Sequence, residues 1–275
     1  MKLGYSEFSF GYAFTENLIR WAATVPGAAP YFPNLYDEGR LGYDVRIDFP
    51  ACPLFLQYKL PDLMVRDTAG EVSIHSLAGL VAPFFRMHLI KRYVSQQHKL
   101  LIDLERRHPH SVFYATPELS SPDLFNDAYI SAEVHLQSVL FSPAEIGYLP
   151  DDQQHVVAYR DSLPYAWFCS RPRKIRAFSF GDVIGPLRMS FEEPRYRTVG
   201  DMARTTLEEV LQLVPWQLRE SVQRIRQSIQ ARRASRVERP GIDEETTSVI
   251  EDLLVSRELS RVGLGVEFVV AQPPG

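Results

Sequence analysis

Three residues near position 50 bring an acid, an amide and an amine to one face of a predicted β-hairpin. The stretch YDVRIDFPACPLFLQYKL contains two largely alternating apolar and polar runs, residues 43–49 and 52–59, which meet at a Pro-Ala pair. A two-residue turn at that pair would place Asp44 directly opposite Gln57. Strand alternation would then put Lys59 on the same face. The sequence therefore predicts that these three side chains lie close together.

Such a cluster suits a hard divalent cation, because Mg²⁺ or Mn²⁺ takes oxygen ligands from a carboxylate, a carbonyl and a substrate phosphate. Asp44 and Gln57 would hold the metal. Lys59 would orient or deprotonate the attacking water, or balance charge on the phosphate. Phosphodiester hydrolysis is the reaction that this set would support. The competing interpretation is a plain hairpin whose polar face only meets water.

The pattern resembles that of the restriction-endonuclease-like nuclease superfamily. In that family an Asp begins one strand of a hairpin, and a Glu or Gln and a Lys separated by one residue lie on the next strand. Asp44, Gln57 and Lys59 stand at these positions, and the Gln-x-Lys form is similar to the variant in Mrr-type and related antiphage nucleases. The resemblance covers about residues 5–117. Two departures are that Tyr43 stands where a proline is usual and that an amide replaces an anionic ligand.

A first helix is expected over residues 6–23, because apolar residues recur there at near-helical offsets. The resemblance implies that a glutamate of this helix completes the metal site. Glu16 is the preferred candidate, since it lies nearer the helix end that would approach the sheet. Glu7 of the same helix and Glu38 of the following loop are the alternatives.

A second helix is expected over residues 87–107, where an apolar stripe follows the i, i+3, i+4, i+7 pattern. Gln97 lies within the stripe. It is either an amide at the edge of the core or, as the resemblance implies, a residue near the substrate or the active-site lysine. Further strands are expected at 111–116, 137–141, 155–159, 165–169 and 265–272, and further helices from Ser121-Pro122 and near 200–213, 215–234 and 243–259.

Two basic segments are candidates for nucleic-acid contact. Arg173 and Lys174 belong to the run RPRKIR, and the helix expected over 215–234 carries arginines mostly away from its apolar stripe. Basic side chains of this kind would meet DNA phosphates or an acidic partner protein. An exposed helix of a bundle would show the same pattern. The candidate arginines there, within the stretch from Arg219 to Arg239, are Arg224, Arg226, Arg232, Arg233 and Arg236.

The composition is that of an ordinary globular protein, with 45% hydrophobic and 23% charged residues. The net charge of −4 means that nucleic acid would have to bind a local basic surface. Neither Cys-x-x-Cys nor His-x-x-x-His spacing occurs, which argues against the usual zinc sites. The sequence also lacks G-x-S-x-G, Walker A and G-x-G-x-x-G motifs. A leader and a membrane-spanning stretch are not expected, so we expect a cytoplasmic protein.

These observations predict an α/β (α+β) protein with a restriction-endonuclease-like core, in which helices flank a central mixed sheet. The core would cover residues 1–196, and a mainly helical C-terminal region, 197–275, would end in a strand. The expected function is that of a DNA endonuclease dependent on Mg²⁺ or Mn²⁺. The resemblance implies a role in bacterial antiphage defence or DNA processing beside a partner NTPase. The alternative is a non-catalytic nuclease-like subunit that acts as a binding or assembly module, and a homo-oligomer is compatible with either function.

Overall fold

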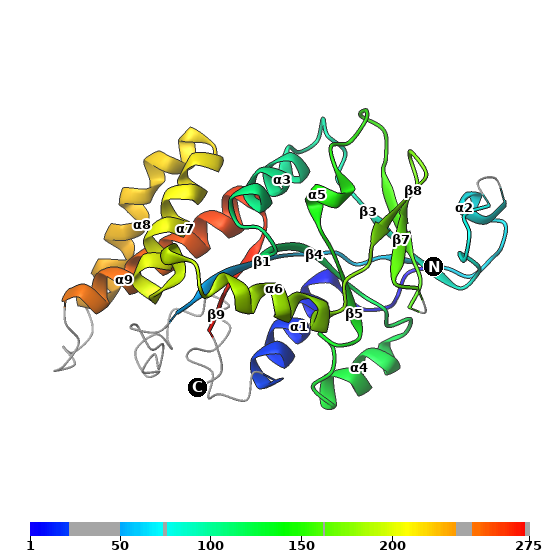
Figure 1. The fold of residues 1–275 in the computed structure, drawn as a ribbon, viewed down its shortest axis with the longest axis horizontal. Helices are drawn as coiled ribbons and strands as arrows, with labels where there is room; N and C mark the ends of the chain where they lie inside the picture. Colours follow the sequence, from blue (N-terminus) through cyan, green and yellow to red (C-terminus); the bar gives the residue numbers. More distant parts are fainter. Residues whose placement is uncertain (22–49, 74–75, 162, 235–243, 273–275) are drawn as a thin grey trace. The chain divides into compact units, whose positions relative to one another are not determined.

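The chain divides into two compact units in the computed structural model (Figure 1). Unit 1 contains Met1–Trp21 and Leu56–Pro186, and unit 2 contains Ala22–Phe55 and Leu187–Gly275. One division between the units falls after Pro186, and another lies within β1 (Cys52–Tyr58), between Phe55 and Leu56. The structure describes residues 1–21, 50–73, 76–161, 163–234 and 244–272.

Helix α1 (Glu7–Trp21) agrees with the first helix predicted from the apolar pattern. Phe10 and Phe14 are fully buried, and both rings lie within 6 Å of the ring of Tyr58 at the end of strand β1 (Cys52–Tyr58). A Cβ at Gly11 would come within 2.6 Å of that ring, so glycine permits the close approach of helix and strand.

A four-stranded sheet has the order β5-β4-β1-β9. Strands β4 (Val112–Pro117) and β5 (Ser138–Phe141) are antiparallel and buried along their whole length. Within unit 1, the Lys59 N–H at the end of β1 donates to the Ala115 carbonyl of β4 at 2.9 Å. Within unit 2, the rings of Phe55 in β1 and Phe268 in β9 (Glu267–Ala271) lie 5.4 Å apart. The apolar run of β1 is what a strand covered on both faces requires.

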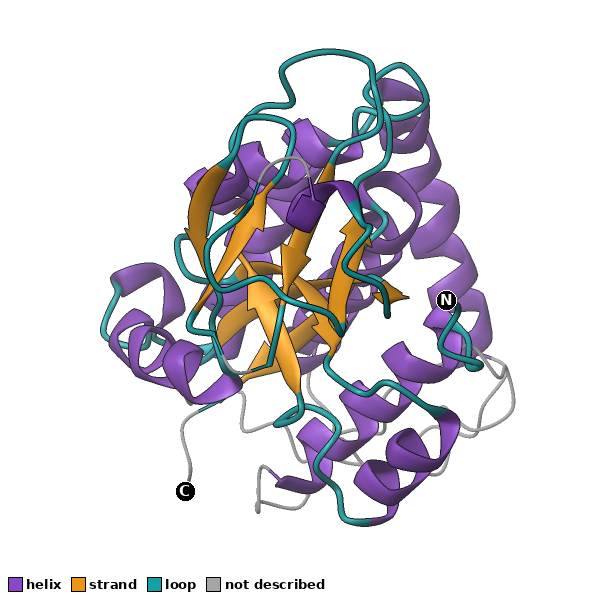
Figure 2. Cartoon of the chain, turned by 90° about the vertical axis from the view of Figure 1, so that its right-hand side faces the viewer, coloured by secondary structure: helices purple, strands orange, loops and turns teal. Residues whose placement is uncertain are grey.

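A second sheet of five strands lies within unit 1 and has the order β2-β3-β6-β7-β8, with every neighbouring pair antiparallel (Figure 2). Its strands β6 and β7 confirm two predicted strands, whereas β2, β3 and β8 were not predicted. The bounds are β2 (Asp62–Met64), β3 (Phe84–His88), β6 (Val156–Tyr159), β7 (Tyr165–Phe168) and β8 (Arg173–Arg176).

The helix predicted over 87–107 is wrong in its first half. Met87 and His88 pair with β6, and the Leu89 N–H donates to the His155 carbonyl at 3.0 Å. Backbone groups that bond to a neighbouring strand are lost to a helix. Helix α3 therefore begins only at Gln97 and ends at Arg107 (Gln97–Arg107).

The remaining helices of unit 1 are short, and Ser121 caps one of them by accepting a hydrogen bond from the Leu124 N–H at 3.3 Å, as its sequence predicted. These helices are α2 (Gly70–Ser73), α4 (Pro122–Ile130) and α5 (Pro143–Ile146). The division between the units falls within α6 (Phe180–Ser190).

Unit 2 is mainly helical, as predicted for the C-terminal region. Its helices are η1 (Pro194–Tyr196), α7 (Val199–Leu213), α8 (Trp216–Ala234), α9 (Glu244–Leu259) and η2 (Ser260–Leu264). The chain is thus a mixed α and β protein with two sheets and flanking helices. In the described part of the chain, no helix combines the length and apolar character needed to cross a membrane.

Candidate functional site

The candidate site lies at the end of β1, where Gln57 is buried instead of solvated. Only 8% of the residue is exposed. Its Nε2 donates to the Tyr58 carbonyl at 3.0 Å, and its Oε1 accepts a hydrogen bond from Gln97 Nε2 at 2.7 Å. A buried amide needs such partners, because an unpaired polar group away from water is costly. The Gln57 side of β1 is therefore covered by protein, and the simple solvated hairpin face is excluded at this position.

Gln97 reaches Gln57 because it is the first residue of α3. The helix packs inward through Leu101 and Leu104, which are fully buried. His98 holds the same turn from another side: its Nδ1 lies 2.8 Å from the Tyr114 hydroxyl and its Nε2 lies 2.7 Å from the Gly147 carbonyl. Burial lowers the pKa of His98, so the ring is neutral at pH 7. These contacts fix the helix end that carries Gln97.

Lys59 follows Gln57 by two residues and is half-buried. Burial lowers the pKa of its amine, because desolvation disfavours the charged form, and the nearby carboxylate of Glu7 opposes this shift. Glu7 Oε2 also accepts a hydrogen bond from the Leu60 N–H at 3.3 Å. A lysine with a lowered pKa gives up its proton more easily, which is the property required of a general base.

Glu7, and not Glu16, is thus the carboxylate of α1 whose charge affects the pKa of Lys59. The contacts of Glu16 are made elsewhere: its carboxylate pairs with Arg20 and accepts a hydrogen bond from Asn17 Nδ2 at 2.8 Å. The charge of Glu16 also contributes to the raised pKa of Tyr129 in α4, after burial of that phenol. These contacts direct Glu16 toward α4.

Asp44 and Glu38 lie outside the described residues, as does the predicted strand 43–49, so the pairing of Asp44 with Gln57 stays a prediction. Among described residues, no group of three or more His, Cys, Asp and Glu side chains could hold a metal. Gln57 Oε1 carries a second lone pair beside the one that accepts from Gln97. That lone pair could accept a further hydrogen bond or contact a cation.

The N-terminus of α3 adds a positive potential to the site. The macrodipole of a helix is equivalent to about half a positive charge at its first turn, where free N–H groups attract anions. Helix α3 begins at Gln97, beside Gln57. An amine, a helix N-terminus and two amides are chemically suited to a phosphate group.

The predicted nucleic-acid residues of β8 are engaged in contacts within unit 1. Arg173 donates to the Glu145 carbonyl at 2.8 Å and also to the Ile146 carbonyl, and its guanidinium lies 5.3 Å from the centroid of the Phe168 ring. The Lys174 ammonium lies 3.8 Å from the centroid of the Tyr165 ring. Both residues are exposed, yet their polar groups already contact protein.

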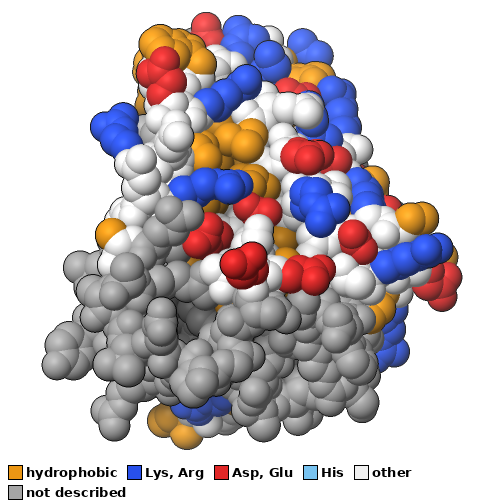
Figure 3. All heavy atoms as spheres, turned by 90° about the vertical axis from the view of Figure 1, so that its left-hand side faces the viewer, with side chains coloured by type: hydrophobic (Ala, Val, Ile, Leu, Met, Phe, Trp, Pro, Cys, Tyr) orange, Lys and Arg blue, Asp and Glu red, His pale blue; other side chains and the backbone are white. Residues whose placement is uncertain are grey.

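The arginines of α8 belong to unit 2. Arg226 pairs with Asp252 of α9 at 2.7 Å, and Arg224 is exposed. The side chains of Arg232 and Arg233, and all of Arg236, lie outside the described part of the chain. On the face drawn in Figure 3, basic and acidic side chains are interspersed among apolar ones. A mixed surface of this kind is typical of a solvated helix bundle.

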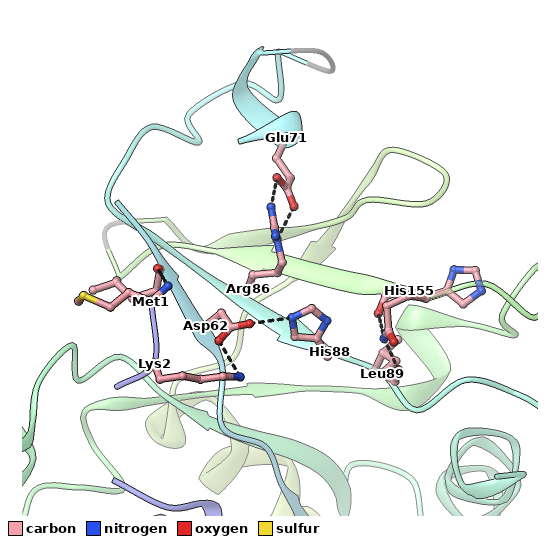
Figure 4. A network of polar contacts seen from close by, with 10 residues as sticks. Met1, Lys2, Asp62, Glu71, Arg86, His88, Leu89 and His155 are labelled. Carbon is pink, nitrogen blue, oxygen red and sulfur yellow. Dashed lines mark hydrogen bonds and ion pairs between the residues drawn. The ribbon is translucent and has the colours of Figure 1, made fainter. Parts of the chain in front are cut away.

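Sequence reasoning missed two polar networks beside β3, which Figure 4 shows. Arg86 donates two hydrogen bonds, of 2.7 and 2.5 Å, to the buried carboxylate of Glu71. Asp62 lies 3.0 Å from the Lys2 ammonium and 3.1 Å from His88 Nε2. Neither set has a recognisable spacing, because its members come from separate elements.

A further missed group is Glu118, which follows β4 directly. Burial, followed by the charge of Asp161, raises the pKa of its carboxyl to about 7. The signal in the sequence was weak: an acid directly after the buried run that ends at Pro117.

No family model, curated protein or solved structure matches this chain.

Proposed function

We propose that unit 1 carries a nuclease centre at the end of β1, which hydrolyses phosphodiester bonds of DNA with Mg²⁺ or Mn²⁺. The observation that supports this proposal best is the 2.7 Å hydrogen bond between Gln97 and Gln57. The sequence pattern singled out both residues, together with Lys59, although the two glutamines lie 40 positions apart. The meeting of these glutamines, the first of which stands two residues before a half-buried lysine in the sequence, fits the arrangement expected of a restriction-endonuclease-like core.

Each residue of the site would have a separate role at the scissile phosphate. Gln57 Oε1 and the Asp44 carboxylate would hold the metal, which supplies charge stabilisation and a more acidic water. Lys59 Nζ would accept a proton from the attacking water, and its lowered pKa increases the share of neutral amine that is able to do so. Once the Lys59 amine is charged, the Glu7 carboxylate would form an ion pair with it. Gln97 would keep the Gln57 amide turned so that its oxygen faces the metal.

The competing function is that of a non-catalytic subunit with a nuclease-like fold. The amide at Gln57 favours this alternative, because a neutral oxygen binds a divalent cation less strongly than a carboxylate does. A hydrogen bond from Gln97 would satisfy a buried amide in either case. The two functions therefore differ in what Lys59 does.

The experiment is a cleavage assay on supercoiled plasmid and on single-stranded DNA with Mg²⁺ or Mn²⁺. Lys59→Met should slow cleavage by at least about a hundredfold, the usual range for loss of a general base. Lys99→Met, which removes an exposed lysine of α3, is the matched control and should cut like the wild type. Circular dichroism would show that both variants fold. Wild-type protein that neither cuts these substrates nor binds Mn²⁺ would establish the assembly role instead.

A further inference from the structure

The segment that leads into Gln97 exposes large apolar side chains next to the candidate site. We call residues 91–96 the Tyr93 turn. Tyr93 is 68% exposed and Val94 is 63% exposed. Apolar side chains gathered at the rim of a site point to a binding surface, whereas scattered ones need no explanation.

The Tyr93 turn has a defined fold. The N–H groups of Val94 and Ser95 both donate to the Lys91 carbonyl, at 2.9 and 3.1 Å. Gln96 Nε2 donates to the Arg92 carbonyl at 3.2 Å. The backbone that carries the exposed ring is therefore ordered before any ligand arrives, which lowers the entropic cost of binding.

Both ends of the turn are tied to unit 1. Arg92 Nε donates to the Asp152 carboxylate at 2.8 Å. At the other end, the Gln97 N–H donates to Ser95 Oγ at 3.1 Å, and the Gln97 side chain bonds to Gln57. Tyr93 thus precedes Gln97, the residue that contacts Gln57, by four residues in the sequence.

A cation lies beside the ring. The Lys91 ammonium lies 5.9 Å from the centroid of the Tyr93 ring, whereas the neighbouring Arg92 is already paired with Asp152. The first turn of α3 adds its own positive end. An aromatic face with a cation beside it has the chemistry that binds nucleic-acid single strands, in which bases stack on aromatic rings and phosphates meet basic groups. A paired base within a duplex offers no free face to such a ring.

We propose that the Tyr93 turn binds single-stranded nucleic acid, with an unpaired base stacked on Tyr93 and the adjoining phosphate on Lys91. The claim that the bound strand is also the strand that is cut rests on the nuclease function proposed for Gln57 and Lys59. The Tyr93 turn would direct the bound nucleic-acid strand toward the N-terminus of α3.

The test is fluorescence anisotropy with a short labelled DNA oligonucleotide, either single-stranded or annealed, and full-length protein in EDTA to prevent cleavage. Tyr93→Ala should weaken single-strand binding about tenfold, whereas Tyr93→Phe keeps the ring and should bind within about twofold of wild type. Lys91→Met should flatten the slope of log Kd against log salt by about one.

Trp216→Ala is the matched control, since it removes a 61%-exposed aromatic residue from unit 2; it should leave the affinity unchanged. The proposal is overturned if wild-type protein does not bind the single strand, if Tyr93→Ala binds as wild type does, or if duplex affinity falls equally. Binding that depends on Tyr93 in a protein that cuts nothing would uphold this surface and reject the nuclease function.

Discussion

Replacement of the two glutamines by leucine, singly and together, tests whether Gln57 and Gln97 form a coupled buried pair. Gln97→Leu would leave the Gln57 oxygen without its 2.7 Å donor, at a position only 8% exposed. The loss of one partner of a buried hydrogen bond costs about 1–3 kcal/mol, because the remaining group is desolvated. Gln57→Leu should have a similar cost. The double variant removes both polar groups, so it should be less destabilised than the sum of the single variants by about 1–2 kcal/mol.

The assay is urea unfolding followed by circular dichroism, with the free energy of unfolding compared across the four proteins. A second cycle that pairs Gln57→Leu with Gln153→Leu is the control, because Gln153 is exposed and its effect should add to within about 0.5 kcal/mol. Costs that simply add in the first cycle as well would refute the coupling. A double variant that is as stable as the wild type and fails to cleave DNA would separate the catalytic role of the pair from its structural role.

Three further substitutions test the packing and charges of unit 1. Gly11→Ala places a Cβ 2.6 Å from the Tyr58 ring and should lower the free energy of unfolding by about 1–3 kcal/mol, measured by urea unfolding. Arg86→Met leaves the Glu71 carboxylate buried without its partner and should cost about 3–5 kcal/mol in the same assay; a cost below 1 kcal/mol would contradict the ion pair. The raised pKa of Glu118, about 7, means that its protonated form stabilises the fold below about pH 4.5 and that this stabilisation is lost as the pH rises through 7. Glu118→Gln should therefore flatten the fall in stability between pH 5 and 8, by up to about 3 kcal/mol, and identical pH profiles would contradict the shift.

The sequence was most informative where a long periodic pattern agrees with the packing. Helices α1, α7 and α9 each begin and end within two residues of their predictions. In α1, however, Phe8 and Tyr12 of the predicted stripe are exposed, and the buried face runs through Phe10 and Phe14. The stripe through Tyr93 and Val94 has the same period, yet both residues are exposed. The pairing of β3 with β6 competes for this stretch of backbone, and the contact comes from a strand about 70 residues away in sequence. The periodicity of a single sequence does not reveal that a distant strand pairs with this segment.

The candidate site shows the same limits. Gln57, Lys59 and Gln97 were singled out because two of them fall on one predicted strand and the third interrupts an apolar stripe. Glu16 and Glu7 are nine residues apart, about two and a half helical turns, so they face opposite sides of α1. Gly11 and Thr15 face Tyr58, and Glu7 shares their i, i+4, i+8 row. Gly11 in that row was the sequence signal that this face of α1 packs closely against another element.

Titration of Mn²⁺ into wild-type protein and two variants of Gln57 tests the central claim, that the Gln57 oxygen is a metal ligand. Gln57→Glu supplies an anionic oxygen at nearly the same place and should tighten Mn²⁺ binding by about tenfold, while Gln57→Leu should abolish binding at this site. Affinity can be measured by calorimetry or by the loss of the free Mn²⁺ resonance signal. Three proteins with the same affinity, or none that binds Mn²⁺, would contradict the account.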